Sequence, residues 1–434
     1  MTLVRSIGRW TMTALVINCI IGIGIFGLPG ELTRLLGRAS PIAMVFGALG
    51  MAIIMACFAE VASQFSETGG PYLYVRTAFG RFLGMQIGWF HLLIDMVGVA
   101  ICAAPFMSYL TKFLPWQLNA WQRALLLGIV IAIPTVANCI GVRIGAALSN
   151  VMTLAKISPL ALLILFGISR FARHPQVIHW SDIASSGLSN WLRAAVFLVY
   201  VFAGPEGAII PTGEIKEPRR TIPFSLAAGL LACAALFTLV QFVVVSTVGT
   251  NPSDEQLAET ASVLLGGGGA VFVSVATMIS AYGWISGALL YSPRLLFAMA
   301  ANRDCPPQLA RLHPSFHTPV LAISLYASTA WVLASSGSFV WLVALGSGGI
   351  ALYYIGTCAA LIRLRKLRPN VGALRVPLGP LLSILGIAIS VGVIAGLKKS
   401  ELLALGIPAI IATADWIWAR TSQPKGSELQ TAAR

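Results

Sequence analysis

Long apolar runs separated by short polar stretches fill the chain from one end to the other. A helix needs ~20 apolar residues to cross a bilayer, and about twelve runs reach that length. No long run alternates between apolar and polar residues, so the pattern does not favour a transmembrane β-barrel. The predicted spans are residues 11–36, 40–64, 84–111, 121–141, 147–169, 191–212, 223–248, 267–300, 319–335, 338–362, 376–397 and 402–420.

The first predicted span contains a cluster of residues that weaken helices, namely Gly22, Gly24, Gly27, Pro29 and Gly30. Each glycine costs ~1 kcal/mol relative to alanine inside a helix. Small residues also allow close helix packing, but five such residues within nine positions exceed what packing requires. We therefore predict that this helix unwinds near mid-membrane and restarts around Leu28-Pro29, because proline suits the first turn of a helix.

The same stretch matches the G-x-G-x-x-G pattern of dinucleotide-binding proteins at residues 22–27. That fingerprint needs a strand before it, a soluble helix after it and an acidic residue ~20 positions further on. The glycines here lie inside one apolar run, and the region around Val45 and Phe46 contains no acid. The pattern therefore does not indicate a nucleotide site.

The sixth predicted span, residues 191–212, is interrupted in a similar way by Gly204-Pro205-Glu206-Gly207. Proline removes a backbone donor, and a glutamate is costly in hydrocarbon. Irregular backbone at that depth is tolerated only where it lines a cavity or is covered by protein. Glu206 has two possible roles, which are to cap amide groups of the restarted half or to accept a proton. Capping is favoured because a helix N-terminus stabilises a carboxylate.

Interrupted spans at corresponding places in two halves of a chain indicate a transporter binding site. The interrupted spans are the first and the sixth, and five spans is an odd number, so the second copy must be inverted relative to the first. The predicted organisation is a cytoplasmic N-terminus (1–10), a first five-helix repeat (11–170), an extracellular loop (171–190), a second, inverted five-helix repeat (191–362), two additional transmembrane helices (363–420) and a disordered cytoplasmic tail (421–434).

The two breaks also predict a type of ligand. The restarted half of the first span presents free amide groups near residues 25–27, which form a partially positive end. The first half of the sixth span ends in free carbonyls near residues 201–203, which form a partially negative end. A carboxylate suits the first end and an ammonium suits the second. A small molecule that carries both groups close together is an α-amino acid.

Composition and charge agree with a membrane protein. The chain of 434 residues is 57% hydrophobic and 10% charged, with a formal net charge of +14. Its basic residues form short clusters between apolar runs, which orients membrane proteins and does not build a nucleic-acid groove. With a cytoplasmic N-terminus, about 19 basic residues lie inside and about 9 outside. Compact loops and short tails favour a bacterial inner membrane, and the seven cysteines show no metal-like spacing.

Four motifs occur in an order that resembles the amino acid–polyamine–organocation (APC) permeases. They are "IIGIGIF" in the first span, "SETGGPYLYVRTAFGRFLGMQIGW" at residues 66–89, "FAGPEGAIIPTGEIKEPRRTIP" in and after the sixth span, and "SPRLLFAMAANRDCPPQLARLHPSFHTP" at residues 292–319. The resemblance covers nearly the whole chain and implies an all-α polytopic protein with the LeuT-type fold, in which helices 1 and 6 are unwound. Ile23 and Pro205 depart from the family's usual residues and leave the identity of the substrate open.

The resemblance also implies a binding site. Backbone groups at the two breaks hold the substrate in such permeases, and aromatic side chains gate it. Tyr200 and Trp284 occupy the gating positions, although Trp284 also fits a packing role. The implied substrate-binding residues are Gly22, Ile23, Gly24, Ile25, Tyr200, Val201, Phe202, Ala203 and Trp284.

Charged residues inside the spans are the remaining candidates. Lys156 either snorkels to the cytoplasmic surface or is a buried cation, and the resemblance implies the second role, in place of the sodium ion of sodium-coupled relatives. Lys156 and Glu206 are therefore the predicted coupling residues, and proton symport and exchange both stay open. Asp95 either faces the pocket and favours a cationic substrate or pairs with another polar group, and the sequence does not decide between them. His91 fits a hydrogen-bonded packing role.

The predicted function is secondary active transport of amino acids or related amines, with no cofactor and no metal. The chain has no G-x-x-x-x-G-K-[ST] motif for ATP. An intramembrane enzyme would need clustered catalytic residues, but the five histidines are scattered. A non-transporting nutrient sensor, and a polyamine or amine transporter or exporter of the same fold, remain as alternatives. The expected partners are the substrate, protons and the lipid bilayer, and the sequence does not fix the oligomeric state.

Overall fold

A computed structural model describes residues 3–421 except 115–117, 174–186, 250–254, 336–338, 370–373, 396, 398–401 and 404. Within these residues the regular structure is helical, and a single parallel bridge joins Ile7 to Ile215. Seven helical segments are long and apolar enough to cross a membrane, and α14 and α16 are shorter apolar helices. The prediction of an all-helical polytopic membrane protein is therefore confirmed.

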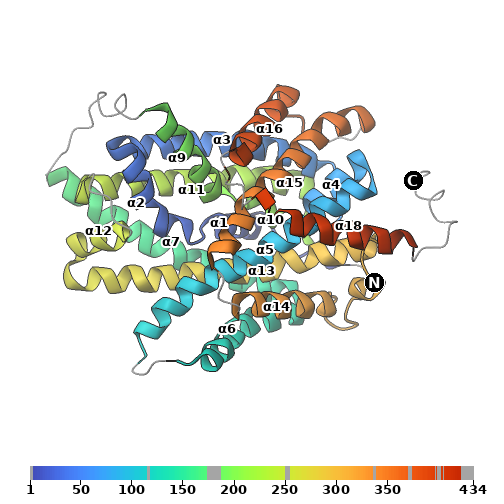
Figure 1. The fold of residues 1–434 in the computed structure, drawn as a ribbon, viewed down its shortest axis with the longest axis horizontal. Coiled ribbons are helices and arrows are strands. Elements are labelled where there is room, and N and C mark those ends of the chain that lie inside the picture. The colour runs from blue at the N-terminus through green and yellow to red at the C-terminus, as the bar shows by residue number, and fades with distance from the viewer. Residues whose placement is uncertain are drawn as a thin grey trace.

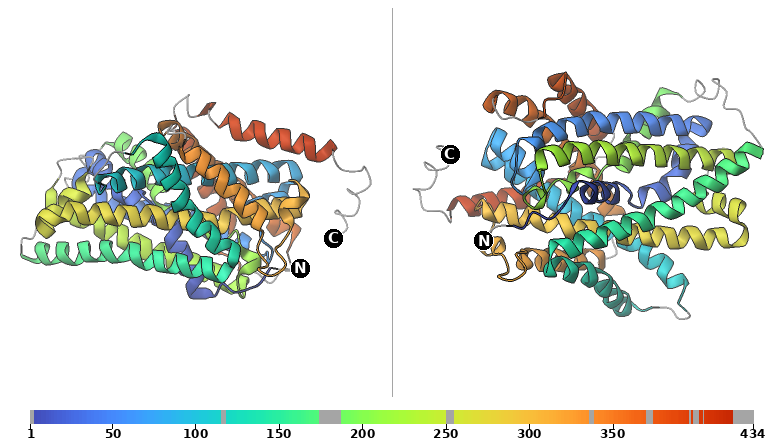
Figure 2. Two further views of the ribbon diagram at one scale, coloured as in Figure 1. Left: turned by 90° about the horizontal axis from the view of Figure 1, so that it is seen from below. Right: turned by 180° about the vertical axis from the view of Figure 1, so that it is seen from behind.

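The helices follow the predicted spans closely, and the long ones lie side by side (Figures 1 and 2). In chain order they are α1 (Arg9–Ile20), α2 (Gly24–Leu36), α3 (Ser40–Ser63), α4 (Gly70–Phe79), α5 (Arg81–Lys112), α6 (Ala120–Ile140), α7 (Val142–Arg173), α9 (Leu188–Phe202), α10 (Pro205–Ala208), α11 (Pro218–Val248), α12 (Gln256–Leu265), α13 (Gly269–Ala301), α14 (Val320–Ser335), α15 (Phe339–Leu367), α16 (Gly379–Ala395) and α18 (Gly406–Thr421). Short 3-10 turns lie at Gly37–Ala39, Thr212–Glu214, Gly266–Gly268 and Pro307–Ala310.

The first span is interrupted, but its second half begins earlier than predicted. Helix α1 ends at Ile20 and α2 begins at Gly24, so the predicted restart around Leu28-Pro29 is wrong. The amide groups of Phe26 and Gly27 both donate to the carbonyl of Ile23, which forms the first turn of α2. Pro29 lies inside α2, where it removes one backbone donor without ending the helix.

The sixth span is interrupted at the predicted place. Helix α9 ends at Phe202, and α10 begins at Pro205. Gly204, between them, has a φ of 118°, a conformation that glycine adopts readily and other residues rarely do. Pro205 is the first residue of α10, where its missing N–H costs no hydrogen bond.

Two helices lie outside the predicted spans. Helix α4 falls in the motif at residues 66–89, and α12 follows the polar stretch after α11. Their sequences are too short or too polar to read as spans, so the search for apolar runs missed them. The predicted tail after Thr421, most of the predicted loop 171–190, and Lys398 and Lys399 lie outside the described residues.

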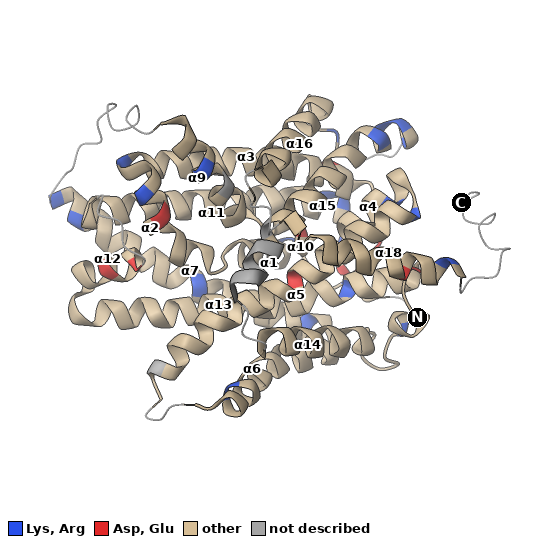
Figure 3. Ribbon diagram, viewed as in Figure 1, with Lys and Arg blue, Asp and Glu red and all other residues tan. Residues whose placement is uncertain are grey.

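Basic residues lie mainly toward the two ends of the long helices, and few charges lie between them (Figure 3). This is the distribution that a bilayer imposes, because charged side chains are costly in hydrocarbon. The N-terminus and the last turn of α18 lie at the same end of the molecule (Figures 1 and 2). Helix α1 packs against α7, α11 and α13, so the break that follows it lies among the other helices.

A buried carboxylate joins two of the motifs at one end of the molecule. Asp304, just beyond α13, is fully buried and accepts hydrogen bonds from Arg76 Nε at 2.9 Å and Arg81 Nε at 2.7 Å. The Tyr72 hydroxyl also donates to Asp304, at 2.5 Å. Burial, reinforced by the neighbouring Asp304, raises the pKa of Tyr72, so this hydroxyl stays protonated. The cluster fixes α4 and the start of α5 to the end of α13.

Replacing Asp304 with asparagine is expected to destabilise the protein by about 3 kcal/mol, because both arginines lose their buried partner. The measurement is the apparent unfolding temperature of the purified protein in detergent, which should fall by several degrees. Glu31→Gln is the matched control, because Glu31 pairs with Arg34 on an exposed face and such pairs contribute less than ~1 kcal/mol. Equal unfolding temperatures for the two variants would contradict this role of Asp304.

Candidate functional site

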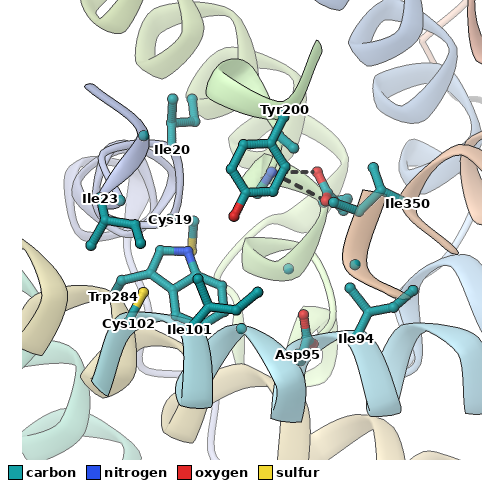
Figure 4. Close-up of a pocket in the computed structure, with 18 of the residues that line it drawn as sticks. Cys19, Ile20, Ile23, Ile94, Asp95, Ile101, Cys102, Tyr200, Trp284 and Ile350 are labelled. Carbon is teal, nitrogen blue, oxygen red and sulfur yellow. Dashed lines mark hydrogen bonds between the residues drawn. The ribbon is translucent and has the colours of Figure 1, made fainter. Parts of the chain in front are cut away.

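A cavity of about 80 Å³ lies between the two helix breaks (Figure 4). Helices α5, α13 and α15 complete its wall. It is lined by Cys19, Ile20, Gly22, Ile23, Gly24, Ile94, Asp95, Gly98, Ile101, Cys102, Tyr200, Val201, Ala203, Gly204, Glu206, Gly207, Trp284, Tyr291, Gly346, Ile350 and Tyr353.

The two breaks touch each other, and glycine makes this contact possible. A Cβ atom on Gly204 would lie 2.4 Å from the carbonyl oxygen of Cys19. That oxygen belongs to the backbone, so it cannot move aside as the end of a side chain could. A Cβ on Gly24 would lie 3.8 Å from the Cα of Val201, which is ordinary contact. The backbone of each break thus packs directly against the backbone of the other.

The helix ends at the cavity have opposite polarity. In the described chain, no hydrogen-bond partner is found for the amide groups of Gly24 and Ile25, at the start of α2. Nor is a donor found there for the carbonyls of Val201, Phe202 and Ala203, at the end of α9. The first end attracts anionic groups, and the second attracts cationic groups. The cavity therefore offers complementary positions for a carboxylate and an ammonium.

Glu206 is held by hydrogen bonds on both of its carboxylate oxygens. The amide of Gly204 donates to both, at 3.1 and 3.0 Å. The hydroxyl of Tyr353 donates to Oε1 at 2.5 Å, and that of Tyr354 donates to Oε2 at 2.9 Å. Glu206 thereby caps the amide of Gly204, just before α10 begins. Both tyrosines belong to α15. Glu206 thus connects the second break to α15.

Lys156 is completely buried, which excludes snorkelling to the surface. Its ammonium donates to the carbonyl of Asn18 at 2.9 Å and to that of Ile21 at 2.5 Å. Ser280 of α13 donates to the next carbonyl, that of Gly22, at 2.9 Å. These bonds satisfy carbonyls at the end of α1 that have lost their helical partners. Space for Lys156 comes from Gly283, whose Cβ would lie 2.3 Å from the lysine Cε.

The predicted substrate-binding residues do not all reach the cavity. Seven of them line it, namely Gly22, Ile23, Gly24, Tyr200, Val201, Ala203 and Trp284. Ile25 is buried in the apolar core, and Phe202 packs against Phe237. Neither side chain is part of the cavity wall, although their backbone groups lie at the two breaks.

Trp284 fits tightly between the first break and α5. A Cβ on Gly22 would lie 3.4 Å from the indole Cδ1, and a Cβ on Gly98 would lie 2.2 Å from Cη2. The indole therefore fills the space beside the cavity that these two glycines leave, and its ring borders the cavity in Figure 4. This arrangement is compatible with both gating and packing.

Asp95 both faces the cavity and pairs with another polar group. Its side chain borders the cavity (Figure 4), and its Oδ2 accepts a hydrogen bond from Ser292 at 2.7 Å. His91, one turn earlier, stacks on Tyr353 with 4.5 Å between ring centroids. Its Nε2 lies 3.6 Å from Asp95 Oδ2, and no partner is found for Nδ1 among the described residues. His91 thus packs by stacking more than by hydrogen bonding.

Sequence reasoning missed an ion pair between two of the motifs. Glu214 accepts a hydrogen bond from Arg294 Nε at 2.8 Å, and both side chains are buried. The carbonyl of Glu214 also accepts from the amides of Ser6 and Ile7, and the Lys216 amide donates to the Ile7 carbonyl. The N-terminal segment is therefore attached beside this pair. The sequence placed both residues in motifs, but only the fold shows that they pair with each other.

The chain is similar to known amino acid permeases and exchangers. A family model described as an amino acid permease matches residues 7–408. The serine/threonine exchanger SteT of Bacillus subtilis is 28% identical, over 94% of this chain and 95% of the relative. The branched-chain amino acid permease BcaP of the same organism is 25% identical, over 85% and 83%. The arginine/agmatine antiporter of Chlamydia pneumoniae is 25% identical, over 94% and 90%.

Proposed function

The chain belongs to the amino acid permease family, and from that premise we propose that it moves a small α-amino acid by alternating access around the cavity between its two helix breaks. It is a membrane transporter and not an enzyme, as the family and its similar relatives indicate. We also propose how the substrate is held, how large it is, and which residues couple substrate binding to closure of the transporter.

The observation that carries the proposal is the opposite polarity of the two helix ends at one cavity. The start of α2 offers amide donors at Gly24 and Ile25, and the end of α9 offers carbonyl acceptors at residues 201–203. A zwitterionic amino acid satisfies both sets at once. Broken helices that present such ends at mid-membrane are typical of transporter binding sites. In this proposal the backbone of residues 22–25 and 200–203 holds the substrate, and Tyr200 and Trp284 cover it.

The size of the cavity supports a small substrate. The cavity volume is about 80 Å³, several times the roughly 10–15 Å³ that one water molecule needs. A cavity of this size favours alanine, serine or threonine over longer substrates such as arginine and spermidine. The serine/threonine exchanger SteT is among the similar proteins, and its substrates are of the same size.

Lys156 and Glu206 are the proposed coupling residues. Lys156 bonds to carbonyls beside the first break, and Glu206 bonds to the amide before the second. Both side chains are buried; Glu206 lines the cavity, and Lys156 reaches it through the carbonyls that it bonds, so either can respond when substrate binds or leaves. The driving species is a proton or a counter-substrate. In this scheme Lys156 serves as a fixed cation that holds the end of α1 in place.

The Glu214–Arg294 pair is the proposed gate at the cytoplasmic side. It lies with residues 6–7 at the end of the molecule where α1 begins, and opening a path there requires the pair to separate.

We further propose twelve spans, arranged as two inverted repeats of five followed by two helices, and a bacterial inner membrane with cytoplasmic termini. The predicted spans, the two interrupted segments and the distribution of basic residues support this organisation.

Counterflow in proteoliposomes tests the proposed function. Vesicles that contain purified protein and unlabelled serine should accumulate external labelled serine, whereas protein-free vesicles should not. An ionophore that abolishes the proton gradient should leave counterflow intact if the protein exchanges, and should reduce net uptake if protons drive it. Binding of amino acids without any flux would contradict transport and would favour the nutrient sensor.

A further inference from the structure

Asp95 is a buried carboxylate at the cavity that the binding scheme above does not use. It lies in the middle of α5, with 6% of its surface exposed. Among the described residues its only hydrogen-bond donor is Ser292, and that bond goes to Oδ2. Its side chain projects from α5 toward the cavity, across from the second break (Figure 4). The Oδ1 atom is thus left to a ligand in the cavity.

The other groups at the cavity make Asp95 the available acidic acceptor. Glu206 also lines the cavity, but both of its oxygens already accept hydrogen bonds from Gly204, Tyr353 and Tyr354. No lysine or arginine is among the described lining residues. Most of the remaining wall is glycine, isoleucine, valine and alanine. The tyrosines Tyr200, Tyr291 and Tyr353 also line the cavity, and a few placed polar groups in a largely apolar wall are the usual way in which a pocket fixes the orientation of a ligand.

Building on the proposed function, we propose that Asp95 accepts a hydrogen bond from a hydroxyl on the β-carbon of the substrate and selects serine-like amino acids over alanine. When the carboxylate and ammonium occupy the ends of α2 and α9, the side chain of the substrate is the part left to reach α5. A hydroxyl donates to the carboxylate, whereas alanine has no donor. The small volume of the cavity, about 80 Å³, favours short side chains over those of lysine and arginine.

The expected discrimination follows from the cost of burying an unpaired acceptor. Alanine would leave a buried side-chain oxygen of Asp95 without a hydrogen bond, which costs roughly 1–3 kcal/mol. Sites that bond a substrate hydroxyl reject analogues that lack it much more strongly than apolar pockets reject an extra methylene. We therefore expect serine to compete at least about tenfold better than alanine in the natural protein.

The test compares serine and alanine as competitors of labelled substrate in counterflow, for the natural protein and two variants. Asp95→Leu should reduce the ratio of serine to alanine affinity by about tenfold or more, since the acceptor is lost. Asp95→Asn should keep part of the ratio, because its amide oxygen can still accept. Glu31→Gln, which removes an exposed carboxylate that is not among the lining residues of the cavity, is the matched control and should leave the ratio unchanged.

The outcomes separate this inference from the proposed function. If no amino acid shows counterflow, the proposed function fails. If amino acids are transported but serine and alanine compete equally in the natural protein, the role of Asp95 is wrong and the transport function stands. If both Asp95 variants lost serine binding and alanine binding equally, Asp95 would have a structural role and would not select the substrate. If 2,3-diaminopropionate competed more strongly than serine, the group that Asp95 prefers to bond would be an ammonium and not a hydroxyl.

Discussion

Replacing Gly204 with alanine is expected to reduce transport on the order of a hundredfold and to lower the stability of the protein. The φ of 118° at this position strains any residue with a side chain, at a cost of roughly 1–3 kcal/mol. The new methyl group would also lie 2.4 Å from the carbonyl oxygen of Cys19, so the two breaks would have to move apart. A shift of ~1 Å in groups that position a ligand reduces enzyme rates on the order of a hundredfold, and we expect a comparable loss of flux.

Gly27→Ala is the matched control for Gly204→Ala. Gly27 belongs to the other interrupted span and lies inside α2, and a Cβ added there would meet no other atom within 4 Å. Alanine at this position should leave flux unchanged and raise helix stability by up to ~1 kcal/mol. Counterflow rates and apparent unfolding temperatures of both variants are the measurements. Normal transport by Gly204→Ala would show that the contact between the breaks is not required.

Replacing Lys156 with alanine is expected to reduce flux to on the order of one hundredth of its natural value. The ammonium bonds the carbonyls of Asn18 and Ile21, and each buried acceptor left without its donor costs ~1–3 kcal/mol. The carbonyls beside the first break would lose their bond to α7, although α1 keeps its hydrogen bonds to Ser149 and Thr153, so substrate binding would be transmitted poorly between these helices. Rates of uptake across a range of external pH values, with and without a proton gradient, measure the effect.

Arg143→Gln provides the comparison for the lysine variant, because Arg143 is an exposed basic residue of the same helix, α7. It should transport normally. The apparent unfolding temperature of Lys156→Ala shows whether the variant remains folded while it fails to transport. Uptake and pH dependence that match the natural protein in Lys156→Ala would end the proposal that Lys156 is a fixed coupling cation.

Apolar periodicity and residue chemistry determined most of the architecture without any tertiary information. Spans could be predicted because a bilayer requires long apolar helices, and this constraint is local in sequence. The second break could be placed at Gly204-Pro205 because both residues have strong backbone preferences. The restart of the first span was misplaced, because Pro29 is tolerated inside α2 and the first turn formed at Gly24 instead.

Part of the cavity lining was also predictable from the sequence. Glycine clusters and the charges at Lys156 and Glu206 are costly within apolar spans, and such costs indicate function. Only the folded chain shows that Ile25 and Phe202 turn their side chains away from the cavity. A backbone motif predicts where carbonyls and amides lie, but the direction of each side chain depends on the neighbouring helices.

The sequence by itself therefore determined a membrane-embedded helical protein with two interrupted spans, and it predicted an amino acid or related amine as the ligand. It could do so because the hydrophobicity of a span and the polarity of a helix end depend on short segments of the chain. Tertiary structure decided which distant residues meet. Asp95 faces the cavity beside Ser292, Asp304 joins Arg76 and Arg81, and Glu214 pairs with Arg294. These contacts join residues far apart in the chain, and their energies depend on burial and distance, which no local pattern encodes.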